Sequence, residues 1–240
     1  MRIAVLVAVP LLVAGCSHDI GSHPGLSRTS TPTSTPTSTP TSTPTSPVSS
    51  ASAAGKPPAG SAASSPPAAG APISAVIAWI EAGHPADPRR YHSMIRDGVT
   101  TELGDDIAFA AQAGKVLCLT DSKHTGSALL CLVSLSNPPP APATAYGEWK
   151  AGWVNFDGTT AQVGAARGDP GPFVNGNGPE LANGDSLSFG DYRCRTDQAG
   201  LFFMNYAHQS AVRLSVGGVE PFGCPRTVPP PDGVGTAFSC

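Results

Sequence analysis

The strongest hydrophobic pattern in the chain lies just after residue 72. Four apolar side chains follow the i, i+3, i+4, i+7 spacing that places residues on one face of an α-helix: Ile73, Val76, Ile77 and Ile80. Pro72 is typical of a helix start and Gly83 of a helix end. The pattern predicts an amphipathic helix at residues 73–82 that packs its apolar face on a sheet, with Trp79 in the core.

From residue 88 onward the apolar residues come in short runs separated by turn residues, which is typical of β-strands. Asp157-Gly158 and residues 197–200 predict hairpin turns, and Asn-Gly pairs predict an irregular loop over residues 168–186. We therefore predict a mainly β, antiparallel domain with disulfide-stapled hairpins and one N-terminal amphipathic helix packed on the sheet, which is α+β in a loose sense. The expected strands are residues 99–103, 115–120, 128–135, 149–156, 192–196, 201–205 and 211–216.

Composition narrows the classes of protein to which the chain can belong. It holds 27 glycines and 26 prolines, and 13% of its residues are charged, which argues against a coiled coil or a helical bundle. The formal net charge is −3, whereas a nucleic-acid binder needs a basic face for phosphate contacts. We therefore expect no nucleic-acid partner.

Residues 1–15 have the layout of a secretory signal peptide. Arg2 precedes an apolar stretch that ends in small residues and is shorter than the roughly 20 residues of a membrane-spanning helix. Val13-Ala14-Gly15-Cys16 resembles a bacterial lipobox, which implies cleavage before Cys16 and acylation of that residue, for example with palmitate. Two or three acyl chains hold a protein stably on a membrane. We predict a lipid anchor on the outer face of the cytoplasmic membrane, in the cell envelope; an ordinary signal peptide with a chance cysteine is the alternative.

Residues 16–71 are predicted to be the lipidated cysteine and a disordered linker, followed by a single globular β-rich domain at residues 72–240. Large apolar side chains are almost absent from the linker, and Ser30–Ser46 repeats Ser-Thr-Pro-Thr with a period of four. Such a composition cannot build a core. Ser and Thr beside Pro also resemble O-glycosylated stalks, and an unmodified linker is the alternative.

Six cysteines without a CxxC pair do not fit a zinc ribbon or a redox motif. Cys118 and Cys131 lie on neighbouring predicted strands, so they can face each other across a hairpin. Cys224 and Cys240 bracket the proline-rich tail, and pairing them would attach the last residue to the domain. We predict the disulfides Cys118–Cys131 and Cys224–Cys240, which form in the oxidising environment outside the cytoplasm.

One cysteine, Cys194, is left as a possible free thiol. If residues 198 and 199 form a two-residue turn, it faces Phe203 across the ladder. It would then be a buried small hydrophobe, or alternatively a reactive thiol or half of an intermolecular disulfide. Pairings that include Cys194 also fit the sequence.

Three stretches carry a resemblance to a known family: residues 75–83, 168–178 and 205–210. Together with the signal sequence, they make the chain resemble the small mycobacterial cell-envelope lipoproteins of the LppI type. The resemblance covers the signal and most of residues 72–240, and this family, whose function is unassigned, brings no catalytic motif. In its pattern a cysteine stands at the position of Phe203, which implies that this chain has lost one half of a hairpin disulfide at Cys194.

The sequence lacks the motifs of the common enzyme classes. GxSxG, SxxK, HExxH and P-loop patterns do not occur, and residues 176–178 do not fit a dinucleotide-binding turn. The histidines of the domain are scattered, and Asp105-Asp106 fits a charged turn better than a calcium loop. We therefore expect no catalytic residue, no metal and no cofactor.

Candidate ligand-binding residues lie in and after the predicted hairpin around residue 198. A period of two places Arg193, Arg195 and Asp197 on one face, either as a solvated face with cross-strand ion pairs or as an anion-binding patch. Tyr206 and His208 follow, as a hydrogen-bonded structural cluster or as a functional pair. The speculative ligand-binding set is therefore Arg193, Arg195, Tyr206 and His208.

Trp149 and Trp153 are four residues apart on one predicted strand, so the spacing places them on the same face. Core packing is the expected role of this pair. If exposed, the two rings could instead stack on a sugar.

An anchor, a linker and a domain without a recognisable nucleophile predict a non-enzymatic, lipid-anchored binding or interaction module of the cell envelope. Its ligand would be an envelope protein or glycan, and we expect a monomer. The alternatives are a structural or antigenic surface protein and an envelope hydrolase that uses His208 or the carboxylates of Asp185 and Asp191. A deep pocket lined by His208, Tyr206 and an acid would favour the hydrolase.

Overall fold

Short β-strands account for most of the folded chain. The computed structural model describes residues 65–167 and 171–240, so the predicted signal peptide, Cys16 and the linker up to residue 64 lie outside the described residues. The helices are α1 (Ile73–Glu81) and α2 (Ser122–Thr125), with the 3-10 turns η1 (Pro88–Tyr91) and η2 (Gly171–Asn175). The strands are β1 (His84–Pro85), β2 (Ser93–Arg96), β3 (Val99–Glu102), β4 (Ala108–Ala111), β5 (Val116–Thr120), β6 (Leu129–Val133), β7 (Trp149–Phe156), β8 (Thr160–Ala166), β9 (Asp185–Phe189), β10 (Tyr192–Asp197), β11 (Gly200–Asn205), β12 (Ser210–Ser215), β13 (Gly218–Gly223), β14 (Arg226–Val228) and β15 (Val234–Ser239).

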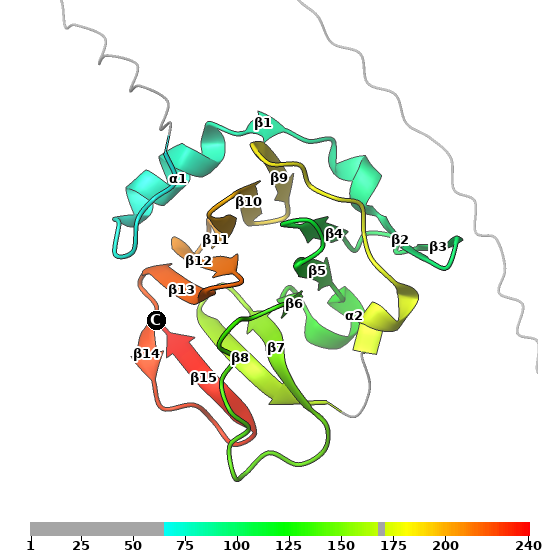
Figure 1. Cartoon of the computed structure of the whole chain (residues 1–240). Coiled ribbons are helices and arrows are strands. Elements are labelled where there is room, and N and C mark those ends of the chain that lie inside the picture. The colour runs from blue at the N-terminus through cyan, green and yellow to red at the C-terminus, as the bar shows by residue number, and fades with distance from the viewer. Residues whose placement is uncertain (1–64, 168–170) are drawn as a thin grey trace, which may run out of the picture. The chain divides into compact units, whose positions relative to one another are not determined.

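Two sheets lie face to face and enclose the main core (Figure 1). The smaller sheet has the strand order β1-β9-β10-β11-β12-β13, and the larger sheet has the order β14-β15-β8-β7-β6-β5-β4. Neighbouring strands are antiparallel except for β1 and β9, which run parallel. The core between them receives Cys131 and Val154 from the larger sheet and Cys194, Phe203 and Val212 from the smaller one.

The outer face of the smaller sheet is also apolar, and α1 covers it. Val76, Trp79 and Ile80 of the helix pack against Phe202 and Met204 of β11, and the ring centroids of Trp79 and Phe202 are 4.6 Å apart. The apolar stripe of the helix therefore contacts the sheet, and the helix occupies nearly the predicted range. It begins at residue 73 and is therefore not at the N-terminus of the chain.

Arg195 of β10 fixes the end of this helix. Its guanidinium donates a hydrogen bond to the carbonyl oxygen of Trp79 over 2.6 Å and stacks on the Trp79 ring, 4.3 Å from its centroid. The last carbonyls of a helix have no partner within the helix, and they carry partial negative charge. The arginine therefore satisfies a helix-end acceptor and holds α1 on the sheet at the same time.

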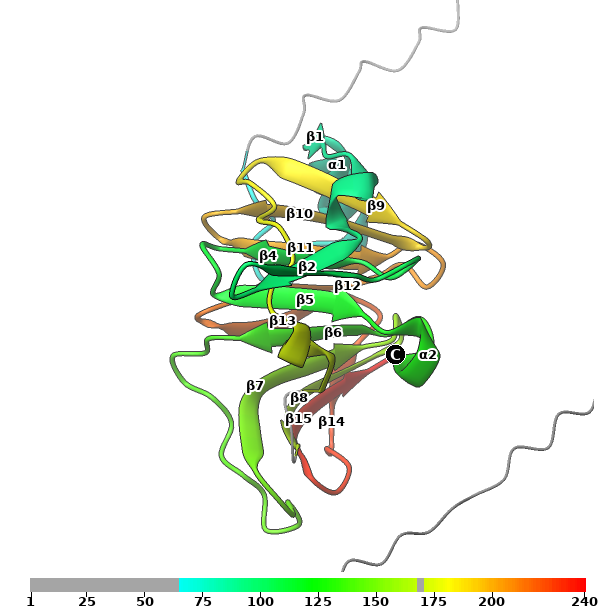
Figure 2. The same ribbon diagram turned by 90° about the vertical axis from the view of Figure 1, so that its right-hand side faces the viewer.

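The outer face of the larger sheet is covered by β2, β3 and the segment that includes η2 (Figure 2). Met94 of β2 joins the same buried cluster as Leu119, Leu130 and Trp153, and Phe173 of η2 packs edge-on against Trp153 at 5.6 Å. The segment after η2 is hydrogen-bonded to β2 and β4 at residues 177–181. These contacts turn part of the irregular loop predicted at residues 168–186 into an ordered cover.

Two glycines allow this cover to lie close to the strands. A Cβ atom at Gly176, whose φ is 104°, would collide with the carbonyl of Ile95. A Cβ atom at Gly178 would collide with the backbone of Ala108. Glycine is therefore required at both positions for steric reasons.

Both predicted cysteine pairs lie at disulfide distance. Cys118 and Cys131 are direct neighbours in the ladder between β5 and β6, and their bond lies within the core between the sheets. Cys224 follows β13, where the chain passes from the smaller sheet to β14 of the larger one, and it is bonded to Cys240. Cys194 is buried and unpaired, and it faces Phe203 in the register predicted from the turn.

The sequence predicts the main strands well and misses several others. The strands expected at residues 115–120, 149–156 and 192–196 are present within a residue at either end, whereas β1, β2, β4, β8, β9, β13, β14 and β15 are additional. The folded part also begins slightly before the predicted boundary at residue 72. Pro67 is buried and Ala71 packs against the α1 cluster, so apolar contacts include the last residues assigned to the linker.

Replacing Arg195 with Met tests how α1 is held. Met keeps much of the apolar stem but loses the hydrogen bond to Trp79 and the charge over its ring, so we expect the free energy of unfolding to fall by about 2 kcal/mol. Urea denaturation followed by Trp fluorescence measures the change. Arg90→Met, at an exposed position, is the matched control and should change the stability by less than about 0.5 kcal/mol. Equal stabilities of the two variants would contradict the role assigned to Arg195.

Candidate functional site

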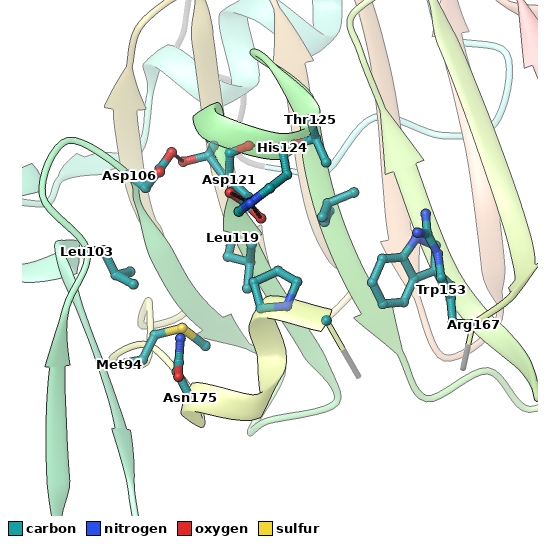
Figure 3. A pocket seen from close by; sticks show the side chains of 14 residues that line it. Met94, Leu103, Asp106, Leu119, Asp121, His124, Thr125, Trp153, Arg167 and Asn175 are labelled. Atoms are coloured by element: carbon teal, nitrogen blue, oxygen red, sulfur yellow. Dashed lines mark hydrogen bonds and ion pairs between the residues drawn. The ribbon is translucent and has the colours of Figure 1, made fainter. Parts of the chain in front are cut away.

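A partly enclosed space with a mixed apolar and charged lining lies on the outer face of the larger sheet, and we call it the sheet cavity. It has a volume of about 500 Å³, within the usual range of roughly 300–1,000 Å³ for small-molecule sites. Figure 3 shows α2 on one side of it, η2 on another, and Trp153 with Arg167 at one end. Its apolar floor consists of Met94, Leu103, Leu119, Leu130 and Trp153, and its polar rim includes Asp106, Asp121, His124, Thr125 and Arg167.

Asp106 is held by hydrogen bonds from the segment that leads into α2. Its Oδ1 accepts bonds from Thr120 Oγ1 at 2.8 Å and from Ser122 N at 2.9 Å, and its Oδ2 accepts one from Ser122 Oγ at 3.1 Å. Asp106 lies just after a turn and before β4, as expected for the Asp105-Asp106 pair. Its carboxylate thus has a structural role, because it fixes the start of α2.

Asp121 and His124 form a second polar pair on the same side of the cavity. His124 Nδ1 lies 2.8 Å from one carboxylate oxygen of Asp121 and 2.9 Å from the other. A carboxylate can only accept, so Nδ1 donates in this contact. The imidazole remains largely accessible, with 66% of its side chain exposed, whereas 16% of the Asp121 side chain is exposed.

Arg167 follows β8 and lies over the Trp153 ring, with its guanidinium carbon 4.5 Å from the ring centroid. Trp153 is 3% exposed, because Arg167 and Phe173 cover it. Among the described residues no carboxylate pairs with the Arg167 side chain. Stacking uses the face of a guanidinium and leaves its N–H edge free to donate.

The two tryptophans that the sequence placed on one face have different surroundings. The register of β7 against β8 shifts between Lys150 and Val154, so the simple alternation is broken between Trp149 and Trp153. Trp149 donates a hydrogen bond to the carbonyl oxygen of Pro139 over 3.2 Å. Trp153 is buried, as core packing predicts, whereas Trp149 is only partly buried, so the pair does not form an exposed platform for a sugar.

The predicted set Arg193, Arg195, Tyr206 and His208 is divided among three places. Arg193 and Arg195 do share a face of β10, but α1 covers this face, and neither arginine takes part in an ion pair among the described residues. Arg195 contacts Trp79, as described above, so it is not available to a ligand. The interpretation of this face as solvated, with cross-strand ion pairs, is therefore wrong.

Arg193 and Tyr206 meet at the edge of α1, in a smaller cavity of about 330 Å³. Tyr206 Oη donates to Glu81 Oε1 over 2.8 Å, and the Arg193 guanidinium lies 5.4 Å from the Tyr206 ring centroid. Burial, reinforced by the hydrogen bond to the Glu81 carboxylate, raises the pKa of Tyr206 to about 12. The phenol is therefore protonated at neutral pH and acts as a donor.

His208 lies apart from this cavity. It lines a separate space of about 550 Å³ with Arg226, at the start of α1. The guanidinium of Arg226 already donates to the carbonyl oxygens of residues 223, 224 and 225, and His208 N donates to Asn205 Oδ1 over 3.0 Å. His208 and Tyr206 thus do not line one pocket with an acid.

Among residues 65–167 and 171–240, no group of three or more His, Cys, Asp or Glu residues could hold a metal ion. Within the same residues, no helix has the length and apolarity needed to cross a bilayer. Comparison of the chain with protein-family models, with curated proteins and with solved structures finds no match. The candidate site must therefore be judged on its own geometry.

The sequence gives little signal for the sheet cavity. Its lining comes from β2, the turn before β4, α2, β7 and the segments on either side of residues 168–170. The one local signal is the stretch Asp121-Ser122-Lys123-His124. Its i, i+3 spacing brings the side chains of Asp121 and His124 together on one helical turn. Everything else depends on tertiary contacts.

Cys194 is expected to be unreactive in the folded protein. Complete burial raises the pKa of its thiol to about 12, and only the thiolate is an effective nucleophile. At pH 8, iodoacetamide should leave Cys194 unmodified in the native state and modify it once the chain is unfolded without a reductant. Mass spectrometry of the peptide that contains Cys194 measures this, with the four cysteines of the two disulfides as unlabelled references. Rapid native-state labelling of Cys194 would contradict its burial.

Proposed function

We propose that this protein is a lipid-anchored binding module of the cell envelope, and that the sheet cavity is its ligand site. The proposal combines the predicted acylation of Cys16 with one structural observation. That observation is a partly enclosed cavity of about 500 Å³ whose floor is apolar and whose rim carries polar groups held in fixed positions. A rigid apolar cavity with a few oriented polar groups is the usual form of a small-molecule binding site.

The hydroxyl groups around the cavity favour binding over hydrolysis. A serine or threonine nucleophile would need to donate its proton to a base such as His124. Instead, the hydroxyls of Thr120 and Ser122 donate to Asp106, and the hydroxyl of Thr125 donates to the carbonyl oxygen of Asp121 over 3.0 Å. His208, Asp185 and Asp191, proposed for a hydrolase, do not line this cavity. The geometry therefore supports a binding role.

A substitution that fills the mouth of the sheet cavity tests whether this cavity is the ligand site. The chain from Ser17 onward, which lacks the acylated residue, is immobilised and incubated with an aqueous extract of the native envelope, and bound molecules are identified by mass spectrometry. We expect a small molecule to be retained by the wild type and lost by at least about tenfold in His124→Trp, because the larger ring occupies the mouth of the cavity.

Lys123→Trp is the matched control for this experiment. It places the same side chain one residue away on α2, at an exposed position that does not line the cavity. The control should retain the molecule as well as the wild type does. Equal retention by His124→Trp and the wild type, with both variants folded by circular dichroism, would rule out the cavity as the ligand site.

Removal of the predicted acylation site tests the anchor. Cys16→Ala should abolish incorporation of labelled palmitate and move the protein from the membrane fraction to the soluble fraction, because the acyl chains supply the membrane affinity. Fractionation by ultracentrifugation and autoradiography of the purified protein measure both effects. Cys194→Ala is the control and should keep the label. A Cys16→Ala protein that still carries palmitate would contradict the proposed anchor.

A further inference from the structure

We infer that the ligand of the sheet cavity is a single-chain amphiphile, whose anionic head binds Arg167 and whose hydrocarbon chain lies along the apolar floor. This inference rests on the proposed function and specifies its ligand class. It is drawn from three features of the cavity: the composition of the floor, the unused donors of Arg167, and the way in which the carboxylates of the rim are already satisfied.

The floor provides a continuous apolar surface. Leu119 and Leu130 are direct neighbours on β5 and β6, and Met94 from β2 belongs to the same cluster. Trp153 extends this surface to the end of the cavity at which Arg167 lies (Figure 3). These side chains of the floor are themselves nearly fully buried, so a hydrocarbon chain here would gain about 25 cal/mol mainly for each Å² of its own apolar surface that it removes from water. A ligand without a hydrocarbon chain would gain less from this floor.

Arg167 is the charged group of the rim whose donors are not used by the described chain. Its guanidinium lies over the Trp153 ring, and no hydrogen bond among the described residues uses its five side-chain donors. A guanidinium edge binds a carboxylate or a phosphate through two parallel hydrogen bonds. The position of Arg167 beside Trp153, at the end of the apolar floor, therefore fits a molecule that combines an anionic head with an apolar chain.

The two carboxylates of the rim do not make the cavity a site for a cation. Both oxygens of Asp106 already accept hydrogen bonds from Thr120 and Ser122. Both oxygens of Asp121 face Nδ1 of His124. A cationic head would have to displace these donors, whereas an anionic head meets Arg167 without breaking any bond among the described residues.

Titration of three probes with the same chain length tests the inference. The chain from Ser17 onward contains every described element and needs no detergent, and it is titrated calorimetrically at pH 7.5 below the critical micelle concentration of each probe. The probes are dodecanoate, dodecyltrimethylammonium and the uncharged dodecyldimethylamine oxide. We expect saturable binding of one dodecanoate, at least about tenfold tighter than either other probe, because only its head pairs with Arg167.

Two substitutions of Arg167 separate the effect of its positive charge from the effect of its paired donors. Arg167→Glu should weaken dodecanoate binding by at least about tenfold, while Arg167→Lys should keep the preference for the anion with lower affinity, since Lys retains the charge but not the paired donors. Arg90→Glu makes the same charge change at an exposed site outside the cavity and should bind like the wild type. Circular dichroism checks that all variants are folded.

The experiments distinguish a wrong ligand class from a wrong binding function. If all three probes bind equally and His124→Trp abolishes their binding, the cavity is a binding site but the anionic class is wrong. Dodecanoate affinity that is unchanged in Arg167→Glu would also overturn the inference. If no probe binds saturably, the inference is wrong, and retention of an envelope molecule by the wild type and not by His124→Trp would still support the binding function.

Discussion

Each sheet of this protein contains a strand that is buried on both faces, and the rest of the structure depends on that constraint. In β11 all six residues are buried, and in β4 all four are. One face of each sheet is buried against the other sheet, and the second face needs a cover of its own because exposed apolar surface is unfavourable in water. The helix α1 covers one outer face, and β2, β3 and the segment around η2 cover the other. A plain two-sheet sandwich of these strands would leave large apolar patches in solvent.

The two covers differ in kind, and the difference explains where the cavity lies. A helix presents a broad continuous stripe, so α1 fills the space over Phe202 and Met204, and Arg195 closes its end. The other cover is assembled from a hairpin and an irregular segment, which approach the strands closely only where glycine allows it, at Gly176 and Gly178. Between this cover and α2 a cavity is left above the outer face of the larger sheet, although most side chains beneath it are nearly fully buried. The sheet cavity is this unfilled region, and its apolar floor is a consequence of the same pattern that builds the core.

Residue patterns predicted the features that depend on local periodicity. The spacing of Ile73, Val76 and Ile80 was enough to place α1, and the turn at residues 198–199 was enough to set Cys194 opposite Phe203. Strands without alternation were missed. An example is β13, which contains Pro221 and survives because it lies at the edge of the smaller sheet. Burial on both faces removes the alternation of apolar and polar residues, so β4 could not be predicted from periodicity. Periodicity also could not show that α1 covers the face of β10 that carries Arg193 and Arg195.

The candidate site was harder to predict than the fold because its residues have no common local pattern. Trp153 is on β7 and Arg167 follows β8, and the register between these two strands shifts between Lys150 and Val154, so a simple alternation does not predict their contact. The described chain enters the fold through α1, over the smaller sheet, whereas the cavity opens on the outer face of the larger sheet.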